Sequence, residues 1–442
     1  MKVYPRWARF LIPFALLTVA GGLRLWGLAA PPITYWDEQY YVFDASAYLG
    51  GGFGEPIGNP PPVRISGEGT WVHPPLGKWM IALGVGPLGV RPLGWRLPSA
   101  AFGIAGVGLV YLLGLELWGS VWWAGLAGLL LAVDGLHIVQ SRMATLDIFL
   151  TTFVTAGVLL LVLDRKRTRG ERSAGAHEWR RVDRWFGTPY RLWAGVCLGA
   201  AVATKWSGLF ALVFGAAVAS VWLFTDGGSR KPSVAARVRS LLLCFAAVPM
   251  IVYLLAYWEF FAEHGPALHA FLSLQARMLD HGLHHQRAQP ENSTPITWPL
   301  LLHPIRYTGY GSTGGRVREV LALGNPVVWW GFLLALPLLA WRAVTARAWQ
   351  LAVVLGGYLA MYVPWFLFGR TQFIFYLVPA VPFMCLGLAD AARSLSRGRT
   401  WVAAGLAAGA ATATVAYAPL WLWLPVSAQW ASRVPLLPGW RS

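Results

Sequence analysis

Long uninterrupted apolar segments constrain this chain more than any other feature of its sequence. Residues 98–115, 241–258 and 326–341, with their flanks, are runs of this kind. A run of about 18 apolar residues is long enough to cross the hydrocarbon core of a bilayer as a helix. Hydrophobic residues make up 56% of the chain and charged residues only 12%, so the chain cannot cover itself with a polar surface. We therefore expect an all-α integral membrane protein.

The pattern of apolar and polar residues predicts about eleven membrane-spanning segments. The run from Phe10 to Ala30 follows three basic residues, as the core of a signal peptide would. Because this run is long enough to cross a bilayer, we interpret it as an uncleaved first span. The predicted spans cover residues 10–30, 97–117, 120–138, 146–163, 191–204, 207–224, 240–258, 326–341, 348–367, 372–389 and 400–424.

The basic residues predict how these spans are oriented. Short cytoplasmic loops of membrane proteins are enriched in Lys and Arg, and a cytoplasmic N-terminus places most basic clusters of this chain on that side. We therefore expect a multi-pass protein of the cell membrane with its functional groups on the outer face. Three regions follow, namely an N-terminal region with the first outer loop at 31–96 (1–258), a second outer loop (259–325) and a C-terminal four-span region (326–442).

The net charge of +17 would suggest nucleic-acid binding in a soluble protein. Here the positive-inside pattern accounts for the charge, and no nucleic-acid-binding motif is evident. The three cysteines, Cys197, Cys244 and Cys385, each lie inside an apolar run. An odd number of cysteines in such surroundings favours packing roles over a disulfide framework or a zinc site.

Two adjacent carboxylates, Asp37 and Glu38, come directly after the first predicted span, in the stretch YWDEQYYVFDASAYL. Adjacent carboxylates can divide labour, because one can accept a proton while the other holds a partner. An ordinary polar loop start is the alternative, since an acidic pair is by itself a weak motif.

The stretch WVHPPLGKWM stiffens the same predicted outer segment with two prolines between His73 and Lys78. A stiff turn that presents an imidazole and an ammonium group suits an anionic headgroup. The alternative is a proline-rich turn back to the membrane with a snorkelling lysine.

Four ionisable residues join the third and fourth predicted spans, namely Asp134, His137, Arg142 and Asp147. Ionisable groups this close to hydrocarbon are costly unless they pair or line a cavity, so a functional site is the first hypothesis. A structural ion pair from Arg142 to Asp147 or Asp134 is the alternative.

Two further cations stand at predicted outer helix ends, Lys205 in ATKWSGLF and Arg370 in FLFGRTQFIFY. Neither is easily explained as facing lipid. Together with the residues above, they place ionisable groups from distant parts of the chain on one side of the membrane, where they can form one site.

The second predicted outer loop carries three histidines, His281, His284 and His285. Histidines three or four residues apart can share a helical face and bind zinc, but no carboxylate or cysteine stands at a strong metal spacing. We therefore expect hydrogen-bonding or substrate-loop histidines and no metal site.

Seven motifs, in order, resemble those of the protein O-mannosyltransferase family. They are DE at 37–38, HPPLGK at 73–78, DGLHIVQSRMATLD at 134–147, ATKWSGLF at 203–210, TWPLLLHPIRY at 297–307, GNPVVWW at 324–330 and RTQFIFYLVPAVPF at 370–383. The resemblance extends to about Asp390 and is to the compact bacterial members. It implies the membrane glycosyltransferase fold called GT-C, and transfer of mannose from a polyprenyl-phosphate carrier to Ser or Thr hydroxyls of secreted or membrane proteins, with acceptors met at the translocon.

The resemblance also implies residue roles. Asp37 matches the proposed catalytic base of the acidic loop motif, with Glu38 beside it, and Arg142 matches an essential arginine of the family. His73 and Lys78 match the family's HPP…K turn. We expect the donor phosphate to be surrounded by His73, Lys78, Asp134, Asp147, Lys205 and Arg370, and we expect Arg142, with Lys205, Lys78 and Arg370, to neutralise it as it departs. The residues implied for the acceptor or the outer loop are His281, His284, His285 and Trp298. The stretch ENSTPITWP departs from the aromatic-rich sequence of many relatives, which concerns acceptor recognition more than donor chemistry.

No cofactor is implied with certainty, because fixed cations can stabilise a departing phosphate without a metal. A divalent cation bound by carboxylates remains compatible with the sequence. The nearest alternative function is a related GT-C enzyme that moves another polyprenyl-phosphate-linked sugar, such as aminoarabinose or arabinose, to a lipid or glycan. A transporter or flippase is the remote alternative, since inverted repeats with broken helices at the midplane are not evident.

Overall fold

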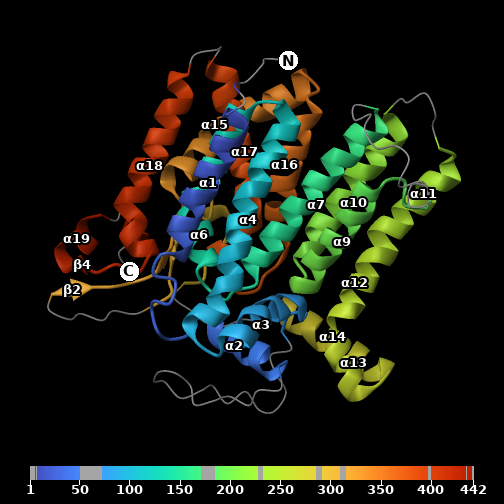
Figure 1. The fold of residues 1–442 in the computed structure, drawn as a ribbon, viewed down its shortest axis with the longest axis horizontal. Coiled ribbons are helices and arrows are strands. Elements are labelled where there is room, and N and C mark those ends of the chain that lie inside the picture. Colours follow the sequence, from blue (N-terminus) through green and yellow to red (C-terminus); the bar gives the residue numbers. More distant parts are fainter. Residues whose placement is uncertain are drawn as a thin grey trace.

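The computed structural model describes residues 5, 7–49, 72–170, 185–226, 232–284, 291–308, 315–396, 400–434 and 436–440. Over these ranges the chain is a bundle of long helices with short helices gathered at one end (Figure 1). Nine helical segments in this part of the chain are long and apolar enough to cross a membrane. They are α1 (Ala8–Leu25), α4 (Pro92–Trp118), α7 (Asp147–Thr168), α10 (Gly208–Thr225), α11 to α12 (Val234–Ala256), α15 (Pro326–Thr345), α16 with η3 (Trp349–Leu367), η4 with α17 (Ile374–Ser396) and α18 (Trp401–Trp421).

The prediction of eleven spans differs from this structure at two places. The span predicted at 120–138 is broken into α5 (Val121–Ala132) and α6 (Gly135–Ser141), which meet at 64°. The span predicted at 191–204 is α9 (Pro189–Thr204), whose 16 residues fall short of a full crossing length. Counting the bent pair as one span gives ten candidate spans among the residues described.

The break between α5 and α6 follows from two adjacent residues. The backbone of Asp134 is extended, and its carboxylate accepts a hydrogen bond from the backbone N–H of His137, which caps the new helix. Gly135 follows, where a Cβ atom would lie 2.1 Å from the Trp421 ring and 2.4 Å from the carbonyl oxygen of Leu323. Only glycine allows α6 to begin this close to its neighbours, so the helix axis turns here.

The centre of the bundle is η4 with α17, where residues 374–392 are all buried. The outer helices instead expose large apolar side chains, such as Leu334 on α15 (83% exposed), Val415 on α18 (77%) and Phe10 on α1 (75%). Apolar surface this extensive is stable only against hydrocarbon, which agrees with the composition argument.

The long loops predicted at 31–96 and 259–325 contain short helices that lie together at the lower end of Figure 1. They are α2 (Glu38–Ala47), α3 (Leu76–Leu88), α13 (Trp258–His264) and α14 (Leu268–His284). Two small antiparallel pairs add the only strands described in this structure. They are β1 (Ile305–Arg306) with β3 (Leu321–Ala322), and β2 (Arg316–Val317) with β4 (Val426–Ser427), which precedes α19 (Ala428–Arg433).

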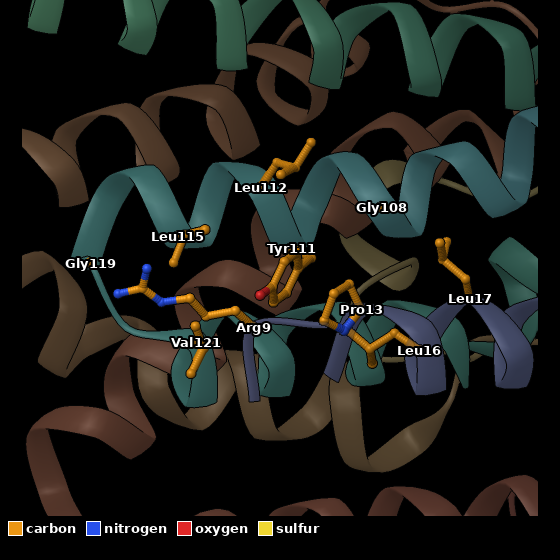
Figure 2. Close-up of a pocket in the computed structure, with 10 residues that line it drawn as sticks. All are labelled: Arg9, Pro13, Leu16, Leu17, Gly108, Tyr111, Leu112, Leu115, Gly119 and Val121. Atoms are coloured by element: carbon orange, nitrogen blue, oxygen red, sulfur yellow. The ribbon is translucent and has the colours of Figure 1, made fainter. Parts of the chain in front are cut away.

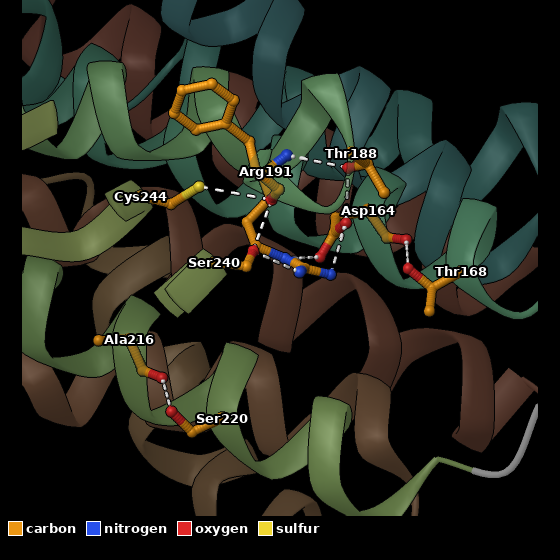
Figure 3. A network of polar contacts seen from close by, with 9 residues as sticks. Asp164, Thr168, Thr188, Arg191, Ala216, Ser220, Ser240 and Cys244 are labelled. Atoms are coloured by element: carbon orange, nitrogen blue, oxygen red, sulfur yellow. Dashed lines mark hydrogen bonds and ion pairs between the residues drawn. The ribbon is translucent and has the colours of Figure 1, made fainter. Parts of the chain in front are cut away.

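The opposite end of the bundle is fastened by buried polar contacts (Figure 3). Arg191 on α9 donates to both carboxylate oxygens of Asp164 on α7, at 3.0 and 3.1 Å, and to the Ser240 hydroxyl on α11. The Thr188 hydroxyl donates to Asp164 at 2.6 Å while it caps α9 through the Arg191 N–H. These contacts tie three helices together far from α2, so we assign them to stability.

Candidate functional site

Asp37 immediately precedes α2, and its carboxylate is partly buried. Its backbone carbonyl accepts hydrogen bonds from the N–H groups of Tyr40 and Tyr41, and these bonds form the first turn of the helix. The carboxylate itself makes no hydrogen bond or ion pair with any residue that the structure describes. Burial raises the pKa of Asp37 to about 6, although the positive charges of Lys205 and Arg370 oppose the shift. A carboxylate with spare acceptor capacity and a raised pKa is suited to accept a proton near neutral pH.

Lys205 and Asp147 form a buried ion pair beside this carboxylate. The Lys205 ammonium lies 2.8 and 3.1 Å from the two carboxylate oxygens of Asp147 at the start of α7. The same ammonium lies 4.6 Å from the ring centroid of Tyr376 and 5.5 Å from that of Phe375, both on η4. The pair therefore has a rigid aromatic support, and Asp147 compensates the charge of Lys205.

Arg370 supplies a second cation, and this one has no carboxylate partner among the described residues. Its guanidinium donates to the carbonyl oxygens of Gly282 and Thr371 and to the Tyr376 hydroxyl, all at 3.2 or 3.3 Å. These neutral acceptors hold the guanidinium in place without cancelling its charge. Arg370 can therefore attract a phosphate group.

His73 and Lys78, the two ends of the HPP turn, lie close to these cations but have different surroundings. Burial lowers the pKa of His73 well below its ordinary value, and Lys205, Lys78 and Arg370 act in the same direction. His73 is therefore neutral at pH 7 and can donate or accept a hydrogen bond. Lys78 is 2% exposed and forms an ion pair of 2.7 Å with Asp44 on α2.

An apolar cavity of about 770 Å³ begins at the cations and continues between helices. His73, Lys205 and Arg370 line its polar end. Its apolar walls come from α9, α10, the α11–α12 segment, α14 and η3, and include Val202, Phe210, Leu212, Phe245, Met250, Leu279 and Trp365. A cavity that is cationic at one end and apolar along its length fits a lipid-linked phosphate.

Glu38, the neighbour of Asp37, is fully buried and is not accessible to solvent. Arg96 of α4 donates to both of its carboxylate oxygens, at 2.8 and 2.9 Å, and both side chains are fully buried. Arg96 also donates to the carbonyl oxygens of Leu28, Pro31 and Ile33. These contacts give Glu38 a positioning task, because they join α2, α4 and the segment between α1 and α2.

Arg142 is directed at the end of α1 and is absent from the lining of the apolar cavity. Its guanidinium donates to four backbone carbonyls, those of Leu23, Arg24, Trp26 and Gly27, at 2.8 to 3.2 Å. No carboxylate in the described part of the chain pairs with it, so the alternative of an Arg142–Asp147 or Arg142–Asp134 ion pair is wrong. A guanidinium is well suited to cap a helix C-terminus, because the last carbonyls have no partners within the helix.

Asp134 lies in a separate buried network. Its carboxylate accepts from the N–H of Asn325 at 3.0 Å and from the indole of Trp329 at 2.8 Å, in addition to His137. His137 in turn contacts the Arg24 guanidinium at 2.8 Å. The predicted grouping of Asp134 with the donor residues is therefore not found in these contacts, which connect α1, α6 and α15.

The residues predicted for acceptor binding from the second outer loop are not all at the apolar cavity. His281 is partly buried and lines the apolar cavity, whereas His284 is exposed and contacts Asp280 at 2.9 Å. His285 lies outside the described residues. Trp298 is buried, its ring lies 6.2 Å from that of Tyr376, and its indole donates to Ser293. Trp298 therefore packs against η4 through the ring of Tyr376.

No group of three or more His, Cys, Asp or Glu residues could hold a metal ion within the part of the chain described. The carboxylates nearest to the site are Asp37 and Asp147, and Lys205 already compensates Asp147. The described residues around Asp37 therefore include no evident set of ligands for a divalent cation.

Three residues of this region were not singled out from the sequence. Asp44 stands seven residues after Asp37, two helical turns along the same helix, so helical periodicity was a usable signal. Arg96 directly precedes a span predicted from the sequence, where an arginine needs a partner. Tyr376 carries no such signal, because only the tertiary structure brings it against Lys205 and Arg370.

Comparison with known proteins finds relatives along most of the chain. Residues 14–264 match the family described as dolichyl-phosphate-mannose-protein mannosyltransferase, and residues 267–433 match the C-terminal four TMM region of protein-O-mannosyltransferase. The polyprenol-phosphate-mannose–protein mannosyltransferase of Mycolicibacterium smegmatis is 32% identical, over 87% of this chain and 81% of its own length. The protein of the same name from Corynebacterium glutamicum is 28% identical, over 88% and 82%.

Solved structures share the fold. The S. cerevisiae protein O-mannosyltransferase Pmt1–Pmt2 complex bound to the sugar donor aligns with a TM-score of 0.80 at 15% identity, over 99% of this chain and 93% of that chain. ArnT from Cupriavidus metallidurans bound to undecaprenyl phosphate aligns with a TM-score of 0.60 at 16% identity, over 91% and 63%. These alignments confirm the predicted GT-C fold.

Proposed function

This chain belongs to the dolichyl-phosphate-mannose-protein mannosyltransferase family, and we propose that it transfers mannose from a polyprenyl-phosphate-mannose donor to Ser or Thr hydroxyl groups of proteins. One observation carries the assignment to this site. Asp37, whose carboxylate has no partner among the described residues, is close enough to Lys205 and Arg370 for their charges to act on it, and these two cations line the polar end of a long apolar cavity. Such a site combines a carboxylate that can act as a base, two cations that can bind a phosphate, and an apolar cavity that can hold a lipid chain.

The donor fits the cavity by its chemistry. The apolar walls between α10, α12 and α14 accept the polyprenyl chain, and the phosphate faces Arg370, Lys205 and neutral His73. Arg370 contributes most of the uncompensated positive charge, because Asp147 balances Lys205. The phosphate gains charge as the sugar bond breaks, so a fixed guanidinium stabilises the transition state more than the ground state.

Asp37 acts as the general base in this proposal. Its carboxylate takes the proton of the Ser or Thr hydroxyl while the oxygen forms a bond to the anomeric carbon. The bond from that carbon to the phosphate oxygen breaks, and its electron pair leaves with the polyprenyl phosphate. Attack from the face opposite to the phosphate inverts the configuration. Phosphate is a good leaving group, so the general acid of a glycosidase is not required.

The site lies at one end of the bundle, and we propose that this end faces the outside of the cell membrane. The distribution of Lys and Arg supports a cytoplasmic N-terminus, and α1 carries the chain from that terminus to Asp37. Acceptor proteins would then meet the site as they leave the translocon. The short helix α9 also runs from the Asp164 end of α7 back to Asp147, which makes the number of crossings odd. A protease-accessible tag placed after Ser442 therefore tests the orientation, because it should be cleaved from the outer side only.

A transfer assay tests the proposed reaction. The purified chain in detergent receives polyprenyl-phosphate-mannose, the corresponding aminoarabinose and arabinose donors, and a peptide with Ser and Thr. We expect mannosyl peptide only, formed equally with and without a metal chelator. The related GT-C activity with another sugar is the weaker alternative, since ArnT aligns less closely than the yeast complex. Preferred transfer of aminoarabinose or arabinose would establish that alternative.

A further inference from the structure

A second cavity, of about 500 Å³, lies between α1, α4 and the start of α5 (Figure 2). It is at the opposite end of the bundle from Asp37, because Arg9 lines it from the first turn of α1 and Asp37 follows the last turn. Arg9 is the one charged side chain in its lining. The proposed transfer reaction uses no part of this cavity.

Two polar side chains of this cavity have no partner within the described chain. The Tyr111 side chain belongs to a residue that is only 5% exposed, yet its hydroxyl forms no hydrogen bond to a described residue. Figure 2 shows that hydroxyl pointing into the cavity beside Pro13 and toward Arg9. Arg9 likewise forms no described hydrogen bond or ion pair. The Tyr111 hydroxyl is not one of the fully buried atoms and Arg9 is exposed, so both groups are free to donate to an anionic ligand atom that enters the cavity.

The cavity becomes apolar away from this pair. Leu17 lies eight residues along α1 from Arg9, about 12 Å deeper in the bundle at the helical rise per residue. Leu17 and Leu112 also line the cavity, and they are 41% and 45% exposed on the surface that faces hydrocarbon. Trp7 and Trp122 pack edge to face at 6.3 Å near the level of Arg9, where indole rings mark the headgroup region.

We propose that this cavity binds an anionic glycerophospholipid. The headgroup phosphate lies between the Arg9 guanidinium and the Tyr111 hydroxyl, and one acyl chain follows Leu16, Leu17 and Leu112 toward the membrane centre. The polar groups stand at headgroup depth and the leucines below them, which is the order of groups in a phospholipid. A free phosphate has no group that could occupy the apolar part of the cavity, whereas the acyl chain of a phospholipid occupies it.

Native mass spectrometry of the full chain, released from nanodiscs of equal phosphatidylglycerol and phosphatidylcholine, tests this proposal. We expect retention of phosphatidylglycerol over phosphatidylcholine. Arg9→Gln should weaken that retention about tenfold and Tyr111→Phe about threefold, as expected for a charged and a neutral hydrogen bond to phosphate. Arg347→Gln is the matched control, because Arg347 is exposed and does not line the cavity. Asp37→Asn should retain the lipid, which separates this site from the transfer reaction.

Three outcomes would overturn the proposal. The first is equal retention of the two lipids by the wild-type chain. The second is the same loss of phosphatidylglycerol in Arg347→Gln as in Arg9→Gln, which would indicate general attraction to the basic end of the bundle. The third is displacement of the lipid by glycerol 3-phosphate at equal concentration, which would identify a site for the free phosphate instead.

Discussion

The Lys205 ammonium lies 2.8 Å from one carboxylate oxygen of Asp147 and 4.6 Å from the centre of the Tyr376 ring. Both members of the ion pair are buried, so the pair brings two helices together at the site while leaving little net charge. Arg370, which also contacts Tyr376, has no described carboxylate partner, so its positive charge near Asp37 is not balanced in the way that Asp147 balances Lys205.

Replacing one member of this ion pair should destabilise the protein more than replacing both members. Asp147→Asn leaves the Lys205 ammonium buried without a counter-charge, and we expect a loss of about 3 kcal/mol. The double variant with Lys205→Met should recover at least about 1 kcal/mol of that loss, since the two groups are in direct contact. Thermal unfolding in detergent measures the four combinations. Strictly additive losses would contradict the pairing.

The pH dependence of transfer should report on Asp37. Its pKa is raised to about 6, so the carboxylate that accepts the proton is lost as the pH falls through 6. We expect kcat/KM to fall about tenfold per pH unit below that value, and Asp37→Asn to reduce turnover at least about a thousandfold at pH 7. A flat profile between pH 5 and 7, or near-normal turnover by Asp37→Asn, would remove Asp37 from the mechanism.

The raised pKa of Asp37 should also make the stability of the protein depend on pH. Stability should fall as the pH rises, whereas activity should fall as the pH falls. The folded state binds the Asp37 proton more tightly than the unfolded state, so ionised Asp37 costs stability above about pH 6 and costs none below its ordinary pKa. Asp37→Asn should therefore melt at a higher temperature than the wild type at pH 8, and the difference should vanish near pH 4. Melting curves at both pH values measure this difference, and Glu38→Gln serves as the contrast because it breaks a buried ion pair.

Arg370 and Arg142 should respond differently to replacement by lysine. Arg370→Lys should lower kcat about a hundredfold with little change in melting temperature, because a point-like ammonium fits two phosphate oxygens poorly. Arg142→Lys should instead lower the melting temperature, since it loses most of the hydrogen bonds to the end of α1. Steady-state kinetics and melting curves of both variants decide the matter. A stable Arg142→Lys protein with a greatly reduced kcat would return Arg142 to the donor phosphate.

Glu38 should be needed for folding rather than for chemistry. Glu38→Gln leaves the buried Arg96 guanidinium without its counter-charge, so we expect a loss of about 3 kcal/mol in stability. Turnover per folded molecule should fall much less than in Asp37→Asn. Activity normalised to the folded fraction, obtained from size-exclusion chromatography, checks this expectation.

The sequence by itself determined the membrane fold and predicted which end of the bundle holds the proposed site residues. Hydropathy is a local property, so the runs that became α4, α7 and α15 could be located to within a few residues. The polar motifs likewise contained Asp37, Lys205 and Arg370, because ionisable groups beside hydrocarbon need a reason to be there.

Only the tertiary structure decided which of these groups act together. Lys205 pairs with Asp147 across 58 residues of sequence, and Arg142 reaches the carbonyls of α1 across more than 114. Residues this far apart show no spacing pattern, and a carboxylate or a guanidinium can serve equally well as a partner, a cap or a catalyst. Their tasks depend on which groups packing brings within about 3 Å, the distance at which a hydrogen bond forms.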